Sequence, residues 1–500
     1  MERNPDHLAK TPFDLLVVGG GINGAAIAHI GARRGLKVAL LEKGDFASGT
    51  SSKSTKLIHG GIRYLENLEL DLVYESLHER RLQLEAAPHL VKPLSIVIPV
   101  YHGDKRPLWM MKLGVSCYDG LAGKAVIQKH RNLTAAEVLE LAPAARREGL
   151  RGGVLYWDAQ MDDFRLCLAN VVSAVQAGAQ AVNYVEVISF IKDNDRAVGV
   201  RAVDLLADHT LEVYAKNVVC ALGPWTNQLL RMDNPSAPKR IRMTKGIHLV
   251  YPGKVSAHGF LIPAKKDDRV FFILPWRGNS LIGTTDTVYS GSPDDVRTES
   301  EDVDYLLSEA DRVFPGVRFE KSSVLSTFAG IRPLIRRGGS PSKVSRKHMI
   351  HRSHSGIWFV AGGKYTTYRR VAVDCLDKIR RGTYGLKHFR LHGGGNLLQT
   401  AEDAAREFNV PPEAARAVMS AHGTAYRDVL QRVLGRPEFG QIVCEAPLIL
   451  KAQIVHAVEA EMARTPDDVI RRLALDSLVN VPAECLGAIE EVLKARGYFS

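Results

Sequence analysis

The chain has 500 residues, of which 45% are hydrophobic and 24% are charged. These values exclude a disordered chain, and the length predicts two or three domains with a large core. Lys and Arg outnumber Asp and Glu by 66 to 55, which gives a net charge of +11. That surplus favours acidic partners, namely phosphorylated metabolites, anionic lipid or nucleic acid, without choosing among them.

The cysteines and the amino-terminal residues indicate the cellular setting. The six cysteines show no C-x-x-C and no paired spacing, so we expect a reducing compartment and neither a zinc site nor a disulfide framework. The first 14 residues contain no apolar signal-peptide core and no Arg/Ser-rich amphipathic stretch, so we expect no signal or transit peptide. Outside the glycine-rich start no apolar run approaches 18 residues, so we expect no transmembrane helix.

Residues 13–24, FDLLVVGGGING, predict a strand, a glycine-rich turn and the start of a helix. Gly19, Gly21 and Gly24 match G-x-G-x-x-G, and a second predicted strand ends at Glu42. In such a βαβ unit the glycines make the turn, admit a pyrophosphate and let helix and strand pack, while the acid accepts hydrogen bonds from a ribose diol. The acid argues against NADP and leaves FAD or NAD; the alternative is a glycine-rich turn in an unrelated α/β fold.

The later elements alternate between strands and helices. A helix is expected over residues 65–87, with Leu65, Leu68 and Leu72 on one face and Pro88 ending it. Further strands are expected at 94–101, 217–222 and 246–250, with a helix over 163–178 and a hairpin within 269–286 that turns at Arg277-Gly278-Asn279. Residues 356–369 predict another strand, a Gly-Gly turn and the start of a helix. After residue 396 the pattern stays helical.

These elements predict an α/β fold: a Rossmann-like dinucleotide-binding domain, an inserted and mostly antiparallel β substrate domain, and an all-α C-terminal domain. We assign residues 1–92, 151–240 and 331–388 to the first domain. Residues 93–150 and 241–330 form the second, and residues 389–500 the third.

Six motifs, in this order along the chain, resemble those of the FAD-dependent glycerol-3-phosphate dehydrogenases, a branch of the D-amino-acid-oxidase-like flavoproteins. They are VVGGGINGAAIA, SSKSTKLIHGGIRYLE, LGPWTNQ, GTTD, FAGIRPL and GGKYTTYR. The resemblance covers most of residues 13–380. The chain ends without the calcium-binding D-x-D-x-D-G extension of the mitochondrial form, so it is similar to the bacterial type. The resemblance implies oxidation of sn-glycerol 3-phosphate to dihydroxyacetone phosphate, with hydride transfer to FAD.

The same resemblance implies how FAD would lie. Residues 48–55 would follow its pyrophosphate and ribityl chain, and Gly60-Gly61 would approach the isoalloxazine without a Cβ in the way. A helix that begins after Gly362-Gly363 would add positive potential. The alternative for residues 51–66 is a polar helix N-cap region. The expected cofactor contacts are Gly19, Gly21, Asn23, Gly24, Glu42, Thr50, Ser51, Ser52, Ser54, Thr55, Leu57, His59, Gly60, Gly61, Gly223, Trp225, Gly362, Gly363, Lys364 and Thr366.

The reaction requires a base that takes the substrate hydroxyl proton, and histidine titrates in the required range. His59 and His248 are the two candidates. The resemblance favours His59 as the base and His248 as a substrate or flavin contact; either could instead be a hydrogen-bonded structural residue. We expect Asp286, in GTTD, to support the site rather than act as the base.

The phosphate of the substrate requires cationic contacts. Arg63, Arg332 and Lys364 match family positions that line this pocket, and Tyr64 and Thr366 add hydroxyl donors. Arg332 is also counted among the catalytic candidates. Arg369 is either a further contact or part of a solvated helix face.

The resemblance implies that membrane quinone accepts the electrons, or oxygen, as in a sister branch. We therefore expect a cytoplasmic protein attached peripherally to the inner face of the cell membrane, through an anionic lipid surface. Residues 105–118, KRPLWMMKLGVSCY, are either an interfacial segment or a core helix with a basic end. A third hypothesis, an FAD-carrying nucleic-acid-binding protein, requires clustered Lys/Arg with aromatics. We find only short basic pairs such as Arg33-Arg34, so no nucleic-acid partner is expected; a homodimer stays open.

Overall fold

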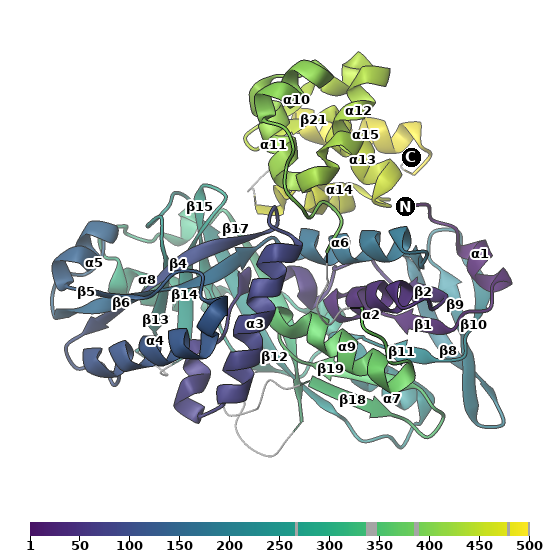
Figure 1. Cartoon of the computed structure of the whole chain (residues 1–500), viewed down its shortest axis with the longest axis horizontal. Helices are drawn as coiled ribbons and strands as arrows, with labels where there is room; N and C mark the ends of the chain where they lie inside the picture. The colour runs from purple at the N-terminus through teal and green to yellow at the C-terminus, as the bar shows by residue number, and fades with distance from the viewer. Residues whose placement is uncertain (266–268, 337–347, 385–389, 478–480, 499–500) are drawn as a thin grey trace.

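The computed structural model describes residues 1–265, 269–336, 348–384, 390–477 and 481–498. Two sheet-containing parts lie side by side, and a helical part sits above them (Figure 1). Both chain ends lie toward the helical part in this view. The boundary expected between residues 388 and 389 falls outside the described residues.

The first part is built on a six-stranded sheet in the order β18-β19-β11-β1-β2-β7, in which every pair except β18 with β19 is parallel. The chain leaves β1 for β2 on one side, and β11 lies on the other, which is the strand order that creates a ligand crevice at the carboxyl edge. The strands are β1 (Leu15–Val18), β2 (Val38–Leu41), β7 (Gln180–Val182), β11 (Val218–Cys220), β18 (His348–Arg352) and β19 (Trp358–Gly362).

Both faces of this sheet are buried because its strands are apolar at consecutive positions. Leu15 and Val17 pack with helices on one face, whereas Leu16 and Val18 pack with a small antiparallel sheet on the other. The helices are α2 (Ile22–Arg33), α6 (Asp163–Gln176) and α9 (Tyr368–Ile379), and the small sheet comprises β8 (Val185–Asp193), β9 (Arg196–Asp204) and β10 (His209–Tyr214). Two further helices of this part are α1 (Pro5–Lys10) and α7 (Thr226–Asp233).

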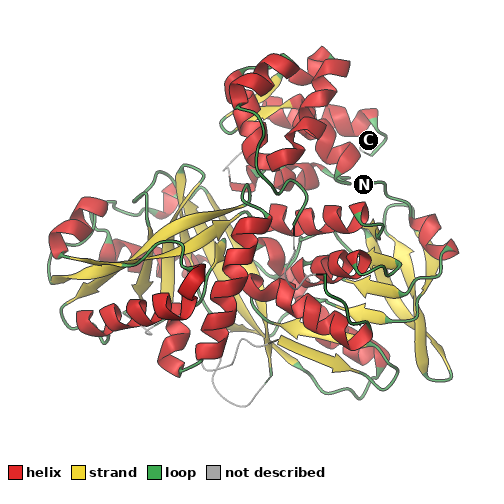
Figure 2. Ribbon diagram, in the orientation of Figure 1, coloured by secondary structure: helices red, strands yellow, loops and turns green. Residues whose placement is uncertain are grey.

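The second part is a ten-stranded sheet that is antiparallel except where β13 meets β4 (Figure 2). Helices α5 (Ala135–Leu141) and α8 (Ser300–Val313) contribute to the core on one face, and α3 (Leu70–Ala86) and α4 (Leu108–Ala122) on the other. The strands are β3 (Leu57–Ile58), β4 (Val91–Tyr101), β5 (Arg131–Leu133), β6 (Leu150–Met161), β12 (Ile241–Tyr251), β13 (Gly259–Pro263), β14 (Val270–Trp276), β15 (Asn279–Gly283), β16 (Thr287–Tyr289) and β17 (Ser326–Ile335).

Strand pairing moves two of the expected boundaries. β6 pairs with β4 along most of its length, so the larger sheet extends to Met161 rather than ending near residue 150. β17 pairs with β12 from Ser326 to Ile335 and crosses the boundary expected at residues 330/331. Both strands belong wholly to the ten-stranded sheet, and only their long-range pairing with β4 and β12 shows where each one ends.

The helix expected over residues 65–87 is broken. A 3₁₀ turn, η2 (Ile62–Asn67), comes first, and Leu68 adopts a left-handed φ of 55° before α3 begins at Leu70. Leu68 lies between the two elements and is 81% exposed, so the prediction that Leu65, Leu68 and Leu72 share one face of a helix is wrong. The helix ends before Pro88, as predicted.

Helix α4 contains the KRPLWMMKLGVSCY stretch, and it is not a plain core helix. Val115 and Tyr118 are buried against the larger sheet, but Trp109 is 68% exposed and Leu113 is 64% exposed. Among the described residues, no helix is long and apolar enough to cross a membrane.

The C-terminal part has its own hydrophobic clusters and is helical apart from one two-stranded sheet, so the all-α prediction omitted a hairpin. Its elements are α10 (Ala401–Phe408), α11 (Pro412–His422), α12 (Tyr426–Gly435), β20 (Ile442–Glu445), β21 (Leu448–Leu450), α13 (Lys451–Ala460), α14 (Pro466–Arg472) and α15 (Ala483–Ala495).

At the base of this part, His422, His456 and Glu461 bring potential metal-ligating atoms within 4.8 Å of one another. Arg165 donates to both carboxylate oxygens of Glu461 at 2.8 Å and approaches His422 at 3.2 Å. The guanidinium therefore balances the buried carboxylate and works against a cation at this place.

Candidate active site

Three glycine turns meet at the carboxyl edge of the six-stranded sheet. Gly19 follows β1, Gly223 lies just beyond β11, and Gly362 ends β19, and these three strands are adjacent and parallel. A Cβ on Gly24 would lie 1.9 Å from the Gly19 carbonyl oxygen, and one on Gly19 would lie 2.6 Å from the oxygen of Ala221. Glycine is therefore required at both positions, as the sequence predicts.

Glu42 lies at the end of β2, beside the first turn. Its carboxylate accepts the backbone N–H of Gly20 at 2.7 Å and of Gly44 at 2.9 Å. Burial raises the pKa of Glu42, and the two N–H groups oppose that shift. Each carboxylate oxygen retains acceptor capacity, so Glu42 can also receive hydrogen bonds from a diol.

A cavity of about 810 Å³ lies at this edge and reaches the larger sheet. Its volume is that of a typical cofactor or ligand site. It brings together most of the residues predicted from the sequence: Gly19, Gly21, Asn23, Glu42, Thr50, Ser51, Ser54, Thr55, Leu57, His59, Tyr64, Gly223, Trp225, His248, Arg332, Gly362, Gly363, Lys364 and Thr366.

Five predicted residues are not in this lining: Gly24, Ser52, Gly60, Gly61 and Arg63. Gly24 and Ser52 support it from behind, through helix packing and through a 3.4 Å bond from Ser52 Oγ to the Gly49 oxygen.

Gly60 corrects our expectation for the HGG motif. A Cβ there would meet Tyr118 Oη at 2.4 Å, so the glycine makes room for the protein's own side chains rather than for a ring in the cavity. The Gly60 N–H donates to Tyr118 Oη at 2.8 Å and to Asp158 at 3.2 Å, and Arg80 pairs with Asp158 at 2.6 Å. A buried polar network thus holds this loop.

His248 comes from β12 and is 2% exposed. Its Nε2 lies 2.9 Å from Thr55 Oγ1, and its ring stacks on Phe328. Burial lowers the pKa of His248 well below its ordinary value, and the cations of Arg332 and Lys56 lower it further. His248 is therefore neutral near pH 7, and its Nδ1 has no hydrogen-bond partner among the described residues.

His59 is tied to the turn after β19. Its backbone N–H donates to Thr366 Oγ1 at 3.1 Å, and the same hydroxyl donates to the His59 carbonyl at 3.2 Å. Two motifs separated by about 300 residues are thereby joined at the cavity wall. Unlike His248, His59 is only half-buried.

Arg332 extends from β17 across β12. Its guanidinium donates to Thr284 Oγ1 at 2.7 Å and to the Thr285 oxygen at 3.1 Å, and pairs with Asp286 at 3.2 Å. A Cβ on Gly246 would lie 2.3 Å from this guanidinium, so that glycine leaves it room. Asp286 thus supports the arginine, as the sequence predicts.

Helix α3 holds the Lys364 loop through buried polar side chains on one face. Ser76 Oγ accepts from Lys364 Nζ at 2.8 Å, and Gln83 Nε2 donates to the Thr366 oxygen at 2.5 Å. Lys364 Nζ also lies 4.2 Å from the centre of the Tyr64 ring.

One turn along the same face, Glu79 accepts from Arg369 Nε at 2.9 Å, and both side chains are buried. Both alternatives expected for Arg369, a substrate contact and a solvated helix face, are therefore wrong, because its guanidinium is buried against the Glu79 carboxylate.

Lys53 is a cavity residue that sequence reasoning missed. Burial lowers its pKa, and its ammonium lies 5.9 Å from the centre of the Phe328 ring. Its place inside the hydroxyl-rich stretch 48–55 was the available signal. Phe272 and Gly330 also line the cavity, but only the folding of the larger sheet brings them there.

Comparison with known proteins identifies the class. Residues 14–368 match the family model described as FAD dependent oxidoreductase, and residues 386–496 match that of the C-terminal domain of alpha-glycerophosphate oxidase. The chain is 38% identical to a glycerol-3-phosphate dehydrogenase of Synechocystis, over 95% of this chain and 91% of that protein. It is 34% identical to the aerobic glycerol-3-phosphate dehydrogenase of Staphylococcus epidermidis, over 93% and 88%.

A solved glycerol-3-phosphate dehydrogenase from Bacillus halodurans, complexed with FAD, superimposes with a TM-score of 0.82 at 31% identity, covering 99% of this chain and 92% of the other. The glycine oxidase of Geobacillus kaustophilus, at 22% identity and a TM-score of 0.58, shares the fold. The chain belongs to the FAD-dependent oxidoreductase family, and the two relatives at 38% and 34% identity are named glycerol-3-phosphate dehydrogenases.

The cavity fits FAD. Gly19 and Gly24 form the close turn that a pyrophosphate requires, α2 begins there without a side-chain cap, and Glu42 offers carboxylate oxygens for a ribose. His248 and Arg332 reach the same cavity from the larger sheet. The cavity lining thus comes from both sheets, and residues of both would hold a bound FAD.

Proposed function

We propose that this chain oxidises sn-glycerol 3-phosphate to dihydroxyacetone phosphate, transfers the hydride to FAD, and passes the electrons to membrane quinone. The observation that carries the proposal is a single cavity in which the dinucleotide-binding turns meet two histidines and several cations. The names of the relatives point to the same substrate.

Arg332 and Lys364 bind the substrate phosphate in this proposal. A guanidinium suits bidentate contact with phosphate oxygens and an ammonium acts as a point charge. Asp286 and Thr284 orient Arg332, while Ser76 holds Lys364. Tyr64 and Thr366 line the same wall and supply hydroxyl groups, whereas Arg63 lies outside the lining and remains a sequence-based candidate.

His59 is the proposed base. FAD, when bound, supplies the hydride acceptor. A base for the substrate hydroxyl should have a pKa near the working pH. The depressed pKa of His248 makes it a weak base, and its Nε2 is engaged by Thr55. His248 is therefore better suited to a hydrogen bond with substrate or flavin.

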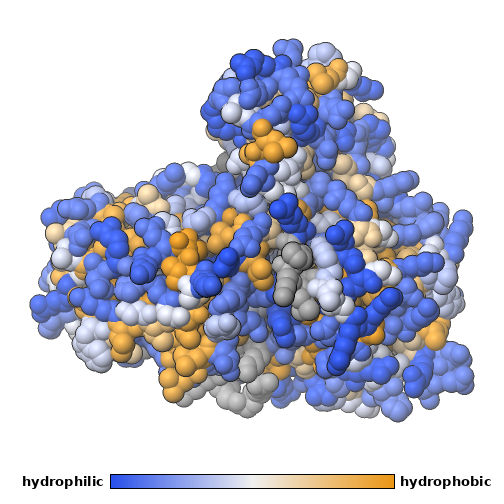
Figure 3. Space-filling view, viewed as in Figure 1, coloured by the Kyte–Doolittle hydropathy of each residue, from blue (hydrophilic) through white to orange (hydrophobic). Residues whose placement is uncertain are grey.

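An exposed apolar surface supports attachment to a membrane. We call it the α3–α4 patch and define it as Leu68, Leu70, Tyr74, Trp109, Met110 and Leu113, all of which are exposed. Helix α4 packs against both α3 and η2, so these residues lie on neighbouring elements. Figure 3 shows hydrophobic side chains gathered on the face over α3 and α4.

Basic side chains accompany this patch at Lys105 and Lys112, which suits the interface with anionic lipid. η2 also contains Tyr64, which lines the cavity, so a lipid-soluble quinone at the patch would be near the flavin site. Attachment at the inner, cytoplasmic face of the membrane stays a prediction from the resemblance. A homodimer and the absence of nucleic-acid binding stay predictions.

Anaerobic addition of glycerol 3-phosphate to the purified yellow protein tests the function. We expect the visible flavin band to bleach, because hydride transfer reduces the flavin, whereas D-amino acids and sarcosine leave it unchanged. Bleaching by an amino acid alone would overturn the proposal. Release of peroxide during turnover in air would favour the oxygen-using oxidase over the quinone-linked enzyme.

Arg332→Ala should raise KM for glycerol 3-phosphate about 10- to 100-fold, because charged hydrogen bonds of this kind contribute about 1.5–3 kcal/mol. Flavin should remain bound, since Arg332 contacts the substrate end of the cavity. Steady-state kinetics and the flavin-to-protein ratio measure both effects. Arg201→Ala, which removes an exposed arginine in the small sheet, is the control. Loss of flavin at an unchanged KM would contradict the assignment.

His59→Gln should lower kcat about 100- to 10,000-fold, the usual contribution of a general base, and leave FAD bound. His248→Gln should act mainly on KM, since the depressed pKa of His248 makes it a weak base and suits it to a hydrogen bond with substrate or flavin. The pH dependence of kcat distinguishes the two: its acidic limb, where the base becomes protonated, should disappear with His59→Gln and persist with His248→Gln. The reverse pattern would make His248 the base.

Replacing Trp109 and Leu113 by Ser should weaken sedimentation with phosphatidylglycerol-containing vesicles at least tenfold, because burial of such side chains contributes about 1.5–3 kcal/mol each. The matched control replaces Leu206 and Leu434, which are 48% and 57% exposed and lie outside both the α3–α4 patch and the cavity lining. Added salt should also weaken binding. Equal loss in both double variants would exclude the patch as the membrane contact.

A further inference from the structure

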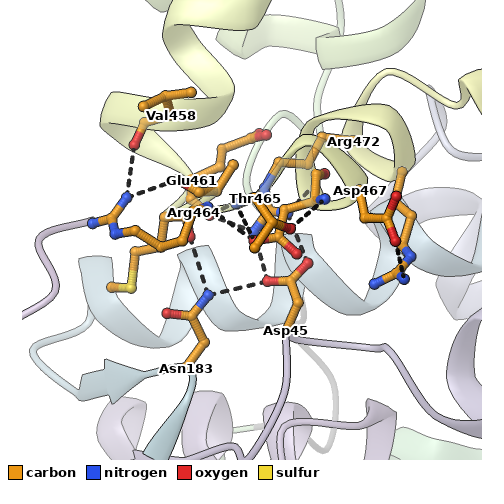
Figure 4. Close-up of polar contacts among 12 residues, drawn as sticks. Asp45, Asn183, Val458, Glu461, Arg464, Thr465, Asp467 and Arg472 are labelled. Carbon is orange, nitrogen blue, oxygen red and sulfur yellow. Dashed lines mark hydrogen bonds and ion pairs between the residues drawn. The ribbon is translucent and has the colours of Figure 1, made fainter. Parts of the chain in front are cut away.

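Behind the ribose end of the cavity lies a fully buried ion pair between two parts of the chain (Figure 4). Asp45 belongs to the loop after β2, and Arg472 is the last residue of α14 in the C-terminal part. The two guanidinium NH groups lie 2.7 and 2.9 Å from the two Asp45 oxygens, and neither side chain is exposed. This is a bidentate contact that solvent does not reach.

Arg472 is held on its own side as well. Its Nε and one NH donate to the Glu461 carbonyl at 3.2 and 2.7 Å, and the other NH donates to the Asp468 carbonyl at 3.0 Å. Backbone carbonyls of the C-terminal part therefore hold the guanidinium in place independently of its contact with Asp45. A fixed arginine fixes the position of the carboxylate that it binds.

Asp45 follows Glu42 by three residues, and hydrogen bonds restrain the loop between them. The Gly44 N–H donates to Glu42, and the Gly44 carbonyl accepts from the Tyr184 N–H at 3.0 Å. The next amide, Val185 N–H, donates to the Glu42 carbonyl at 2.8 Å. Displacement of Asp45 would consequently be transmitted to the Glu42 carboxylate.

The two residues that follow β7, Asn183 and Tyr184, also join this loop to the C-terminal part. Asn183 Nδ2 donates to Asp45 at 3.1 Å and to the Met462 carbonyl at 3.0 Å. Tyr184 Oη donates to both oxygens of Asp468, at 2.7 and 2.9 Å. Residues 42–45, 183–185 and 461–472 thus form one polar network across the contact between the two parts.

A network of this kind is a poor source of stability alone, because burying two charges costs about as much as their attraction returns. The ion pair does constrain the relative position of the two parts, since Asp45 and Arg472 lose their partners when either part moves.

We propose that the C-terminal domain is part of the cofactor site, and that Arg472 is a positioning residue that holds the Glu42 loop through Asp45. The inference rests on the proposed contact of Glu42 with the FAD ribose. Docking of α14 and binding of the adenosine end of FAD are then linked, and the linkage is reciprocal. FAD should tighten the contact between the two parts, and the contact should tighten the hold on FAD.

The test measures FAD dissociation from the full-length protein by flavin fluorescence. Arg472→Met should weaken FAD binding at least tenfold, with KM for glycerol 3-phosphate and kcat per bound flavin within twofold. Arg471→Met is the matched control: it removes the preceding arginine, whose side chain is 28% exposed and whose contact with Asp467 is long, at 3.7 Å, and it should change FAD affinity less than twofold. Equal FAD affinity in Arg472→Met and wild type would overturn the inference.

Two further variants separate positioning from plain stability. Arg472→Lys keeps the charge but loses the bidentate contact, and should give an intermediate FAD affinity. Asp45→Asn with Arg472→Met removes both buried charges and should recover thermal stability, while FAD and ADP still bind more weakly than to wild type. Recovery of both stability and affinity in this double variant would reduce Arg472 to a structural residue.

Glu42→Gln separates this inference from the assignment on which it rests. If Glu42→Gln weakens FAD binding and Arg472→Met does not, the ribose contact holds and the role of Arg472 falls. If Glu42→Gln has no effect on FAD affinity, both fall, while the oxidation of glycerol 3-phosphate is still tested by flavin bleaching.

Wild-type protein gives a test that needs no variant. FAD should slow amide hydrogen exchange in α14 relative to the apoprotein, because linkage acts in both directions. Helix α10, in the same domain but outside this network, should exchange equally in both forms. Unchanged exchange in α14 would overturn the inference even if Arg472→Met failed to fold.

Discussion

The close approach of α2 to the end of β1 is the constraint on which the cofactor site depends. At Gly24 the distance left to the Gly19 carbonyl excludes any side chain, so the helix begins directly above the turn and its first N–H groups lie there. The neighbouring strands β11 and β19 run parallel to β1, and their own glycine turns therefore arrive at the same edge. A cavity for an elongated dinucleotide follows from this alignment.

Helix α3 connects this edge to the larger sheet. Its buried polar residues Ser76, Glu79, Arg80 and Gln83 recur at helical spacing and bind segments that are far apart in the sequence. Arg80 binds Asp158, which also accepts the Gly60 N–H in the loop that contains His59. Ser76 and Gln83 bind the loop that contains Lys364. Burial of four polar side chains is costly unless each has a partner, so the helix and the two loops form one unit. The same helix begins at the exposed α3–α4 patch.

Much of the fold and of the site could be predicted from local patterns. The strand, glycine turn and terminal Glu42 are consecutive features whose geometry the backbone dictates. The Arg277-Gly278-Asn279 turn is likewise local: Arg277 and Gly278 adopt φ values of 49° and 85°, which a tight hairpin requires. Helix α3 ends before Pro88 for an equally local reason. His59, Arg332 and Lys364 were predicted as site residues from the resemblance to known enzymes, because their positions along the chain do not show that they lie together.

The sequence by itself determined the dinucleotide turn, the alternation of elements and the residue types that face the cavity, because these depend on interactions between near neighbours. Only the tertiary structure decided that Gly60 faces Tyr118, that Arg369 pairs with Glu79, that Lys53 enters the cavity and that Arg472 reaches Asp45. Each of these is a contact between segments separated by tens to hundreds of residues. A buried charge pairs with the opposite charge that the packing of sheets and helices places beside it. Such a pair produces no periodic pattern in the sequence, so local patterns cannot predict it.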